Sequence, residues 1–325
     1  MVFYASGAQL LVLSAAIGFA ACAPAQQDYP NRPIRLVVPY PAGGPLDPVA
    51  RAIGQKLSEV LSQPVVVDFR AGATGSIGAD NVAKAAPDGY TLLLIASSFV
   101  IAPSLSTKLP FDPIKDFAAV SLTTTGHDVL IAHVGLPAKS VKELIALAKE
   151  RPGKLTFGSS GTGGPLHLFG ELFKSMTGTD MLHVPYKGGG PAMADVIGGH
   201  VDLMFVGLAA AVPHVKNGKL RALGVASLER VASLPEVPTI IEAGVPGFVA
   251  NPFTGILAPA ATPTAVITKL NAALVQILQT QDIKQRFAAW DVEPRGSSPA
   301  QFDAYLREQI AKWAKVVKIA GLKTE

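Results

Sequence analysis

Residues 34–48 read IRLVVPYPAGGPLDP, an apolar run followed by a loop with adjacent glycines and the start of a helix. The run from 34 to 38 has the length and composition of a buried strand, and apolar residues recur with a helical period between Val49 and Leu61. A strand that leads directly into an amphipathic helix is half of a βαβ unit. The segment therefore predicts an α/β fold with a Gly-rich corner after its first strand.

The same alternation continues along the chain and predicts mostly parallel sheets. Further strand-like runs, separated by helical patterns, lie at 65–68, 91–95, 129–133, 155–158, 201–206 and 220–226. Helical patterns dominate the C-terminal part, at 263–279, 281–290 and 299–319. The last helix is expected to turn one stripe to the core: Phe302, Leu306, Ile310, Trp313 and Val317.

An internal repeat indicates two related domains. Residues 43–46 (GGPL) recur as residues 163–166, and GGPA follows at 189–192. Because the first two copies each lie between a predicted strand and a predicted helix, their loops could face one cleft; chance recurrence in a Gly- and Pro-rich chain is the alternative. We expect one domain from residues 26–129 plus 256–325 and a second from 130–255, with the two chain crossings forming a hinge.

The N-terminus indicates export. An apolar run at 10–21 is too short to span a bilayer, which needs about 20 residues, but it fits a signal peptide over 1–25 cleaved after Ala25. The segment before it lacks the usual Lys or Arg. Two alternatives stay open: a lipoprotein signal in which Cys22 is acylated, and a buried N-terminal helix.

Composition excludes several classes of protein. The 325 residues include one Cys, so zinc ribbons, CxxC redox sites and internal disulfides, which need two or more cysteines, are excluded. The 28 basic and 24 acidic residues give a net charge of +4 without a basic cluster, so no nucleic-acid surface is expected. The sequence has no Gly-rich phosphate-binding motif and no HExxH pair. We therefore expect neither a cofactor nor a metal.

Both Gly-rich loops have the chemistry of an anion site. Bare N–H groups and the positive end of a helix dipole can hold an anion. In the first loop, Asp47 is expected to be the N-cap of the following helix. The second loop, GSSGTGGP at 158–165, adds three hydroxyl donors, so it could hold a carboxylate without Arg. Loops that only turn the chain are the alternative.

Other chemistry has weaker support in the sequence. There is no GxSxG elbow, and the six histidines are expected to be mainly surface or hydrogen-bonded core residues. His167 is an exception, because it follows the second loop, and with Ser160 it offers the single pair for a hydrolase-like enzyme. Lys187 is the cation beside a Gly-rich loop, or simply a solvated lysine. The effector domain of a cytoplasmic regulator is a further alternative.

Several stretches in order along the chain resemble the Bug family, the TctC-like extracytoplasmic solute receptors of tripartite tricarboxylate transporters. The sequence differs from the family pattern at 69–72, where it reads FRAG and the family usually has Asn-Arg-Pro-Gly. This difference puts in doubt any ligand contact at Phe69 or Ala71. The matching stretches are 29–39, 41–44 with Asp47 and 50–51, 72–78, 87–92, 158–163 with 167–168, 184–188, 202–205, 234–239 and 242–244.

This resemblance implies a type II periplasmic binding protein fold, with two α/β domains that close on a ligand. It also implies a non-enzymatic periplasmic receptor that binds a di- or tricarboxylate, an acidic amino acid or an aromatic acid and presents it to a tripartite tricarboxylate transporter or a sensor. We expect the receptor to be a monomer. Carried over by position and combined with the residue analysis, the expected ligand-binding residues are Ala42, Gly43, Gly44, Asp47, Ser159, Ser160, Gly161, Thr162, Gly163, His167, Lys187 and Asp202.

Overall fold

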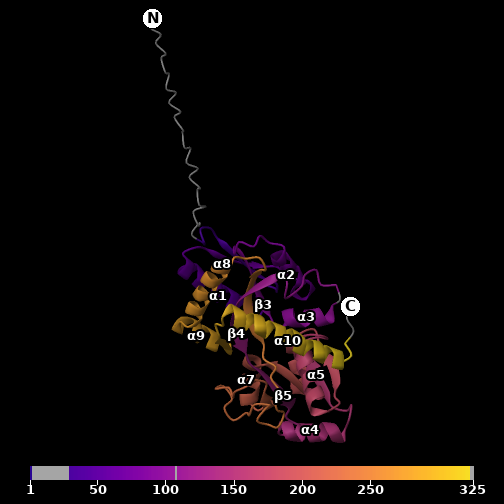
Figure 1. Cartoon of the computed structure of the whole chain (residues 1–325). Helices are drawn as coiled ribbons and strands as arrows, with labels where there is room; N and C mark the ends of the chain where they lie inside the picture. The colour runs from indigo at the N-terminus through magenta and orange to yellow at the C-terminus, as the bar shows by residue number, and fades with distance from the viewer. Residues whose placement is uncertain (2–28, 107, 323–325) are drawn as a thin grey trace.

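The computed structural model describes Met1 and residues 29–106 and 108–322. Figure 1 shows two lobes, each built around one sheet. The first sheet has the strand order β11-β4-β10-β3-β1-β2, and the second has the order β7-β6-β8-β5-β9. The expected α/β architecture of two lobes is confirmed. The expected signal peptide, with Cys22, lies outside the described residues.

The first lobe begins with the predicted βαβ units. β1 (Ile34–Val38) pairs in parallel with β2 (Val65–Phe69) and β3 (Thr91–Ala96). β1 is apolar on both faces because helices cover both sides of the sheet. The helices that follow these strands are α1 (Asp47–Leu61), α2 (Ser76–Ala83), preceded by the 3₁₀ turn η1 (Ala73–Gly75), and α3 (Ser98–Leu105).

The chain crosses between the lobes at His127. This residue separates β4 (Phe117–Gly126) of the first sheet from β5 (Asp128–His133) of the second. The chain returns between β9 (Leu220–Val225) and β10 (Phe253–Pro259). The expected boundaries at 129/130 and 255/256 therefore fall inside β5 and β10, a few residues beyond the crossings.

The sheets are mixed rather than mostly parallel, which corrects the expectation from the sequence. β10 runs antiparallel to β3 and β4, and β5 runs antiparallel to β8 and β9. The reason is topological: strands that enter from the other lobe start at the junction, where the local βαβ strands end.

The second lobe carries its own βαβ units. β6 (Thr156–Ser159) pairs in parallel with β7 (Leu182–Pro185) and β8 (Leu203–Gly207). The helices of this lobe are α4 (Val141–Glu150), α5 (Pro165–Thr177), α6 (Gly189–Gly198) and α7 (Leu208–Lys216).

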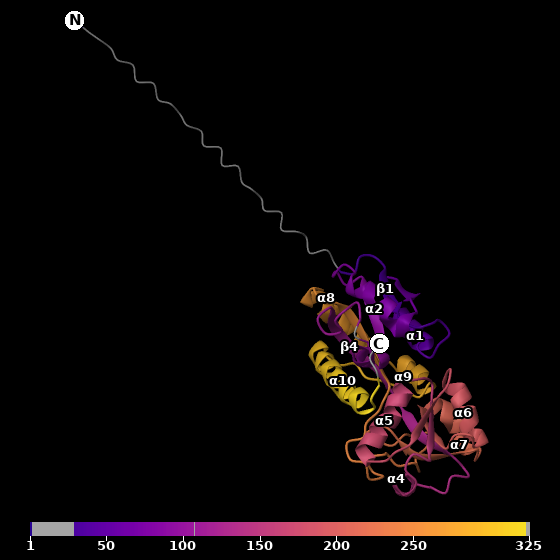
Figure 2. The ribbon, with the colours of Figure 1, turned by 90° about the vertical axis from the view of Figure 1, so that its right-hand side faces the viewer.

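The C-terminal helix α10 (Pro299–Ile319) packs against both lobes. It follows α8 (Thr264–Leu278), α9 (Gln281–Ala288) and β11 (Val292–Pro294), and in both views it lies beside the junction (Figures 1 and 2). Its Trp313 ring stacks on Phe169 of the second lobe, with 5.5 Å between ring centroids. Four of its five predicted core residues are buried, and Ile310 is partly exposed. Across the described residues, no helix is both long and apolar enough to cross a bilayer.

Candidate functional site

Two adjoining cavities lie between the lobes. The larger, of about 610 Å³, has walls from the first lobe, including Leu46, and from the second, including Leu208. The smaller, of about 170 Å³, lies between the second Gly-rich loop and helix α3. Ser98 and Pro165 line both cavities, so the two form one cleft.

The second Gly-rich loop forms one wall of the smaller cavity. Residues 160–165 line it, facing Thr74 and helix α3 of the first lobe. Gly163 has φ +77°, and a Cβ atom built on it would lie 2.9 Å from Cδ1 of Leu105. A side chain at this position would both strain the backbone and push against the opposite lobe. The backbone conformation therefore favours glycine here, and a side chain at this position would make the Leu105 side chain move.

The hydrogen bonds of this loop leave two of its residues free to bind a ligand. The N–H of Gly161 donates to Ser159 Oγ at 3.2 Å, and the N–H of Gly164 donates to the Gly161 carbonyl at 3.4 Å. Among the described residues, the N–H and hydroxyl groups of Ser160 and Thr162 have no hydrogen-bond partner. Since α5 begins directly afterwards, the helix dipole also favours negative charge here.

A pair of histidines supports the loop from behind. The N–H of Gly163 donates to His167 Nδ1 at 3.0 Å, and Ser159 Oγ lies 2.7 Å from His183 Nε2. The two imidazole rings stack with their centroids 3.6 Å apart. Burial, together with the neighbouring His167, lowers the pKa of His183 to about 4. The His183 ring is therefore uncharged at neutral pH, and the two rings together hold both ends of the loop.

This arrangement gives His167 a structural role in place of ligand contact. The side chain is buried, and its Nδ1 accepts from Gly163 rather than facing Ser160. Among the described side chains, no hydrogen bond joins Ser160 to His167. The geometry therefore does not support the hydrolase-like pair.

The first Gly-rich loop is closed on itself by Asp47. The Asp47 carboxylate accepts from the N–H of Gly43 at 2.7 Å and pairs with Arg51. The Gly43 bond is the main cause of the lowered pKa of Asp47. Asp47 is the first residue of α1, and Leu46 is the N-cap, which corrects the expected capping role.

The first loop reaches the cleft through residues 45 and 46. Ala42 and Gly43 are exposed, and residues 42–44 are not among those that line either cavity. The loop continues into Pro45 and Leu46, which line the larger cavity together with Pro165 of the second loop. The two corners thus meet at one cavity through Pro45, Leu46 and Pro165, whereas the predicted ligand contacts at Ala42, Gly43 and Gly44 line neither cavity.

Two expected site residues lie elsewhere. The Asp202 carboxylate accepts from the N–H and hydroxyl of Thr156, at 2.7 and 2.9 Å. Thr156 begins β6, whereas Ser159 ends it, so Asp202 lies at the far end of the sheet from the cleft and cannot contact a ligand there. Lys187 is exposed in the connection between β7 and α6 and lines neither cavity.

Thr74 and Ser98 are among the cleft residues that the sequence analysis missed. Thr74 belongs to a run from Gly72 to Gly75 in which all four φ angles are positive, with φ +55° at Thr74 itself. A β-branched residue in this conformation is strained, and such strain gathers at binding sites. Ser98 begins α3, and its hydroxyl lies 2.7 Å from that of Tyr40. The glycines at 72 and 75 were the available sequence signal for this wall.

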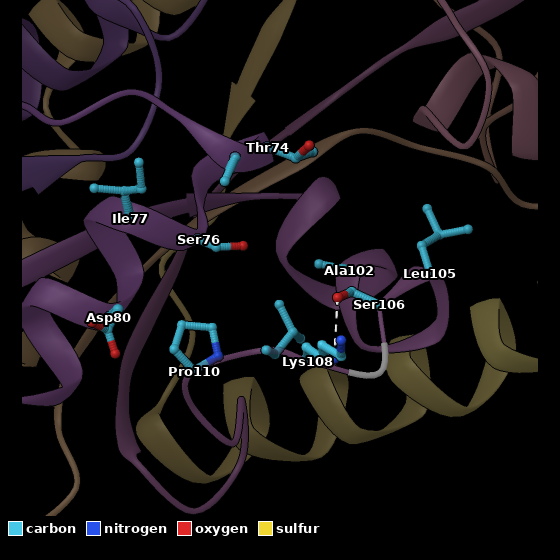
Figure 3. Close-up of a pocket in the computed structure, with 11 residues that line it drawn as sticks. Thr74, Ser76, Ile77, Asp80, Ala102, Leu105, Ser106, Lys108 and Pro110 are labelled. Carbon is cyan, nitrogen blue, oxygen red and sulfur yellow. Dashed lines mark hydrogen bonds between the residues drawn. The ribbon is translucent and has the colours of Figure 1, made fainter. Parts of the chain in front are cut away.

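A third cavity, of about 560 Å³, adjoins the smaller one along Thr74, Ala102 and Leu105. Figure 3 shows its side chains, which include Asp80 and Lys108. Its described lining residues all belong to the first lobe, whereas the other two cavities have walls from both lobes. The cleft between the lobes is therefore the better candidate site. In the described part of the chain, no cluster of His, Cys, Asp and Glu could hold a metal ion.

Comparison with known proteins agrees with this architecture. Residues 49–322 match the family model described as "Tripartite tricarboxylate transporter family receptor". The chain belongs to this receptor family. It is 40% identical over 304 residues to Protein BugT of Bordetella pertussis, an alignment that covers 93% of each protein.

Two solved structures of similar proteins are described with a carboxylate. A protein of R. palustris described with adipate has 37% identity and a TM-score of 0.76, with coverage of 92% of this chain and 100% of that one. MatC of Rhodopseudomonas palustris, described with bound malate, has 34% identity and a TM-score of 0.72, with coverage of 89% and 100%. The resemblance to the Bug family and its two-lobed binding fold is thus confirmed.

Proposed function

We propose that this receptor binds a small carboxylate in the cleft between its lobes, in the periplasm, and passes it to a membrane transporter without chemical change. The observation that carries the proposal is the set of free donors on Ser160 and Thr162 at the start of α5. The carboxylates named for two structural relatives support the same ligand chemistry. Family membership supports the periplasmic location and the transporter partner.

Binding would favour closure because the cleft has walls from both lobes. A carboxylate held by loop 160–164 gains contacts with Thr74 and Ser98 when the lobes approach each other. A ligand shifts a conformational equilibrium only through such differential contacts. The crossing at His127 is a natural hinge for this movement.

Calorimetry with the mature chain and a panel of mono-, di- and tricarboxylates tests the proposal. Hydrogen bonds to a charged group contribute about 1.5–3 kcal/mol each, so replacing Ser160 with Ala and Thr162 with Val should weaken binding by 10-fold or more, roughly. Thr268→Val is a matched control, because it removes an exposed hydroxyl on α8. Equal affinity of the double variant and wild type would refute the assigned site.

The absence of turnover needs its own measurement. Ligand recovered from prolonged incubation with the protein should be unchanged by NMR. Conversion that is lost in Ser160→Ala would instead support an enzyme.

A further inference from the structure

The larger cavity of the cleft is mainly apolar. Its walls come from α1, α7, β10 and the segment after α9. They are formed chiefly by aliphatic and aromatic side chains, among them Leu46, Val49, Leu208, Phe253 and Trp290. Such a surface favours burial of an apolar ligand group.

The polar side chains in this cavity are largely paired with one another. The hydroxyls of Thr124 and Thr254 lie 2.6 Å apart, and Ser97 Oγ accepts from the N–H of Phe253 at 3.1 Å. The Ser98 hydroxyl is similarly paired with Tyr40. Each of these hydroxyls therefore has a protein partner already, and none of them carries a charge that would balance a second ligand carboxylate.

The charged residues here also disfavour a second carboxylate. Among the described residues that line the two cleft cavities, there is no Lys or Arg, and Asp291 is the acidic one. His127 lines the larger cavity, but its Nε2 lies 3.4 Å from Glu293. Burial raises the pKa of Asp291, and the nearby His127 and Lys216 oppose this shift, so Lys216 already faces an acidic group. A second ligand carboxylate in this cavity would meet a like charge without a free cation to compensate.

We propose that the ligand is a monocarboxylic acid with an apolar body, aromatic or aliphatic, rather than a di- or tricarboxylate. The inference rests on the proposed function: the carboxylate binds at Ser160 and Thr162, and the body fills the larger cavity. Because Ser98 and Pro165 line both cavities, a carboxylate joined directly to an apolar body can occupy the two together. This assignment differs from the dicarboxylates named for the two structural relatives.

The first test compares phenylacetate and hexanoate with adipate and citrate by calorimetry on the mature chain. The monocarboxylates should bind at least about tenfold more tightly. Tighter binding of adipate or citrate would overturn the inference while leaving the proposed function intact. Failure of every acid to bind would instead overturn the proposed function, as would an unchanged affinity in the Ser160 and Thr162 variant.

Two variants test whether residues of the larger cavity determine the preference for monocarboxylates. Asp291→Asn should raise the affinity for adipate relative to phenylacetate by about tenfold, because it removes the like charge. Glu236→Gln, which removes a charge from the exposed surface of the second lobe, is the control and should leave this ratio unchanged.

Ala210→Phe, at an exposed helix position that lines the larger cavity, should weaken phenylacetate binding at least about tenfold by filling the space for its ring. Unchanged phenylacetate affinity in a folded Ala210→Phe protein, or an unchanged ratio in Asp291→Asn, would contradict the placement of the apolar body.

Discussion

Gly163 of the second lobe and Leu105 of the first approach each other so closely that a methyl group on Gly163 would displace the Leu105 side chain. A Cβ atom on Gly163 would lie 2.9 Å from Leu105 Cδ1. This contact joins the ligand-binding loop to the opposite wall of the cleft, so it couples the backbone of the loop to the separation of the lobes. It also supplies a variant that tests closure without removing any proposed ligand donor.

Gly163→Ala should therefore weaken carboxylate binding by about tenfold or more, because the added methyl group opposes closure. Gly178→Ala is a matched control: Gly178 also has a positive φ, +62°, but nothing lies within 4 Å of its Cβ position. Both variants should lose about 1–2 kcal/mol of unfolding free energy through backbone strain. Calorimetry and urea unfolding separate the two effects, and equal ligand affinities in the two variants would exclude a role for this contact in closure.

Thr74 offers a test of strain maintained for binding. Ala73 and Thr74 have positive φ angles of +45° and +55°, and each such conformation costs about 1–3 kcal/mol of folding free energy. Replacing either residue with Gly should recover part of this cost. Of these two residues, Thr74 lines the smaller cavity of the cleft and Ala73 does not. Thr74→Gly should therefore weaken ligand binding more than Ala73→Gly does. A greater loss of affinity in Ala73→Gly would assign the role to loop shape instead of the Thr74 side chain.

The histidine pair predicts acid sensitivity of the second lobe. The folded-state pKa of His183 is about 4, below its ordinary value of 6.5. Between these pH values the unfolded chain binds a proton that the folded chain does not, so unfolding free energy falls as pH is lowered from 6.5 towards 4. With allowance for partial exposure, His183 should contribute a loss of about 2 kcal/mol over this range.

His183→Gln removes the titration and keeps a group that can hydrogen-bond to Ser159. Urea unfolding between pH 7 and 4 should show that the variant loses less stability than wild type on acidification. Parallel profiles of the two proteins would show that His183 does not titrate as the geometry indicates.

Asp128 should act in the opposite direction. It is buried at the crossing between the lobes, and burial raises its pKa to about 7 from an ordinary value of 3.8. The folded chain retains the proton in this range while the unfolded chain releases it, so stability falls as pH rises from 3.8 to 7. Asp128→Asn should therefore stabilise the protein by about 2–4 kcal/mol at pH 8 and by less at pH 5. Thermal unfolding at the two pH values measures this gain, with the exposed Asp180→Asn as control; equal gains at both pH values would argue against a buried ionisation.

Much of the fold could be predicted because its signals are local. The apolar run at 34–38 coincides with β1, and the helical patterns near the C-terminus coincide with α8, α9 and α10 within a few residues. The strand at 117–126 was missed. It contains polar residues such as Thr123 and Thr124, whose hydroxyls are satisfied by Thr254 from the other end of the chain. A local sequence pattern does not predict a polar strand that is buried by a partner far away in the sequence.

Periodicity, turn residues and donor content are properties of neighbouring residues, so the two-lobed α/β fold, the Gly-rich corners and the hydroxyl-rich loop at 158–165 could be predicted before the structure was known. The tertiary structure alone decided which donors are free. Gly43 and Gly163 lose their N–H groups to Asp47 and His167, Asp202 is held at the far end of the sheet, and Thr74 faces the loop across the cleft. A hydrogen bond consumes a donor only when folding brings its acceptor within about 3 Å, and for a cleft between two lobes that geometry depends on the packing of the whole chain.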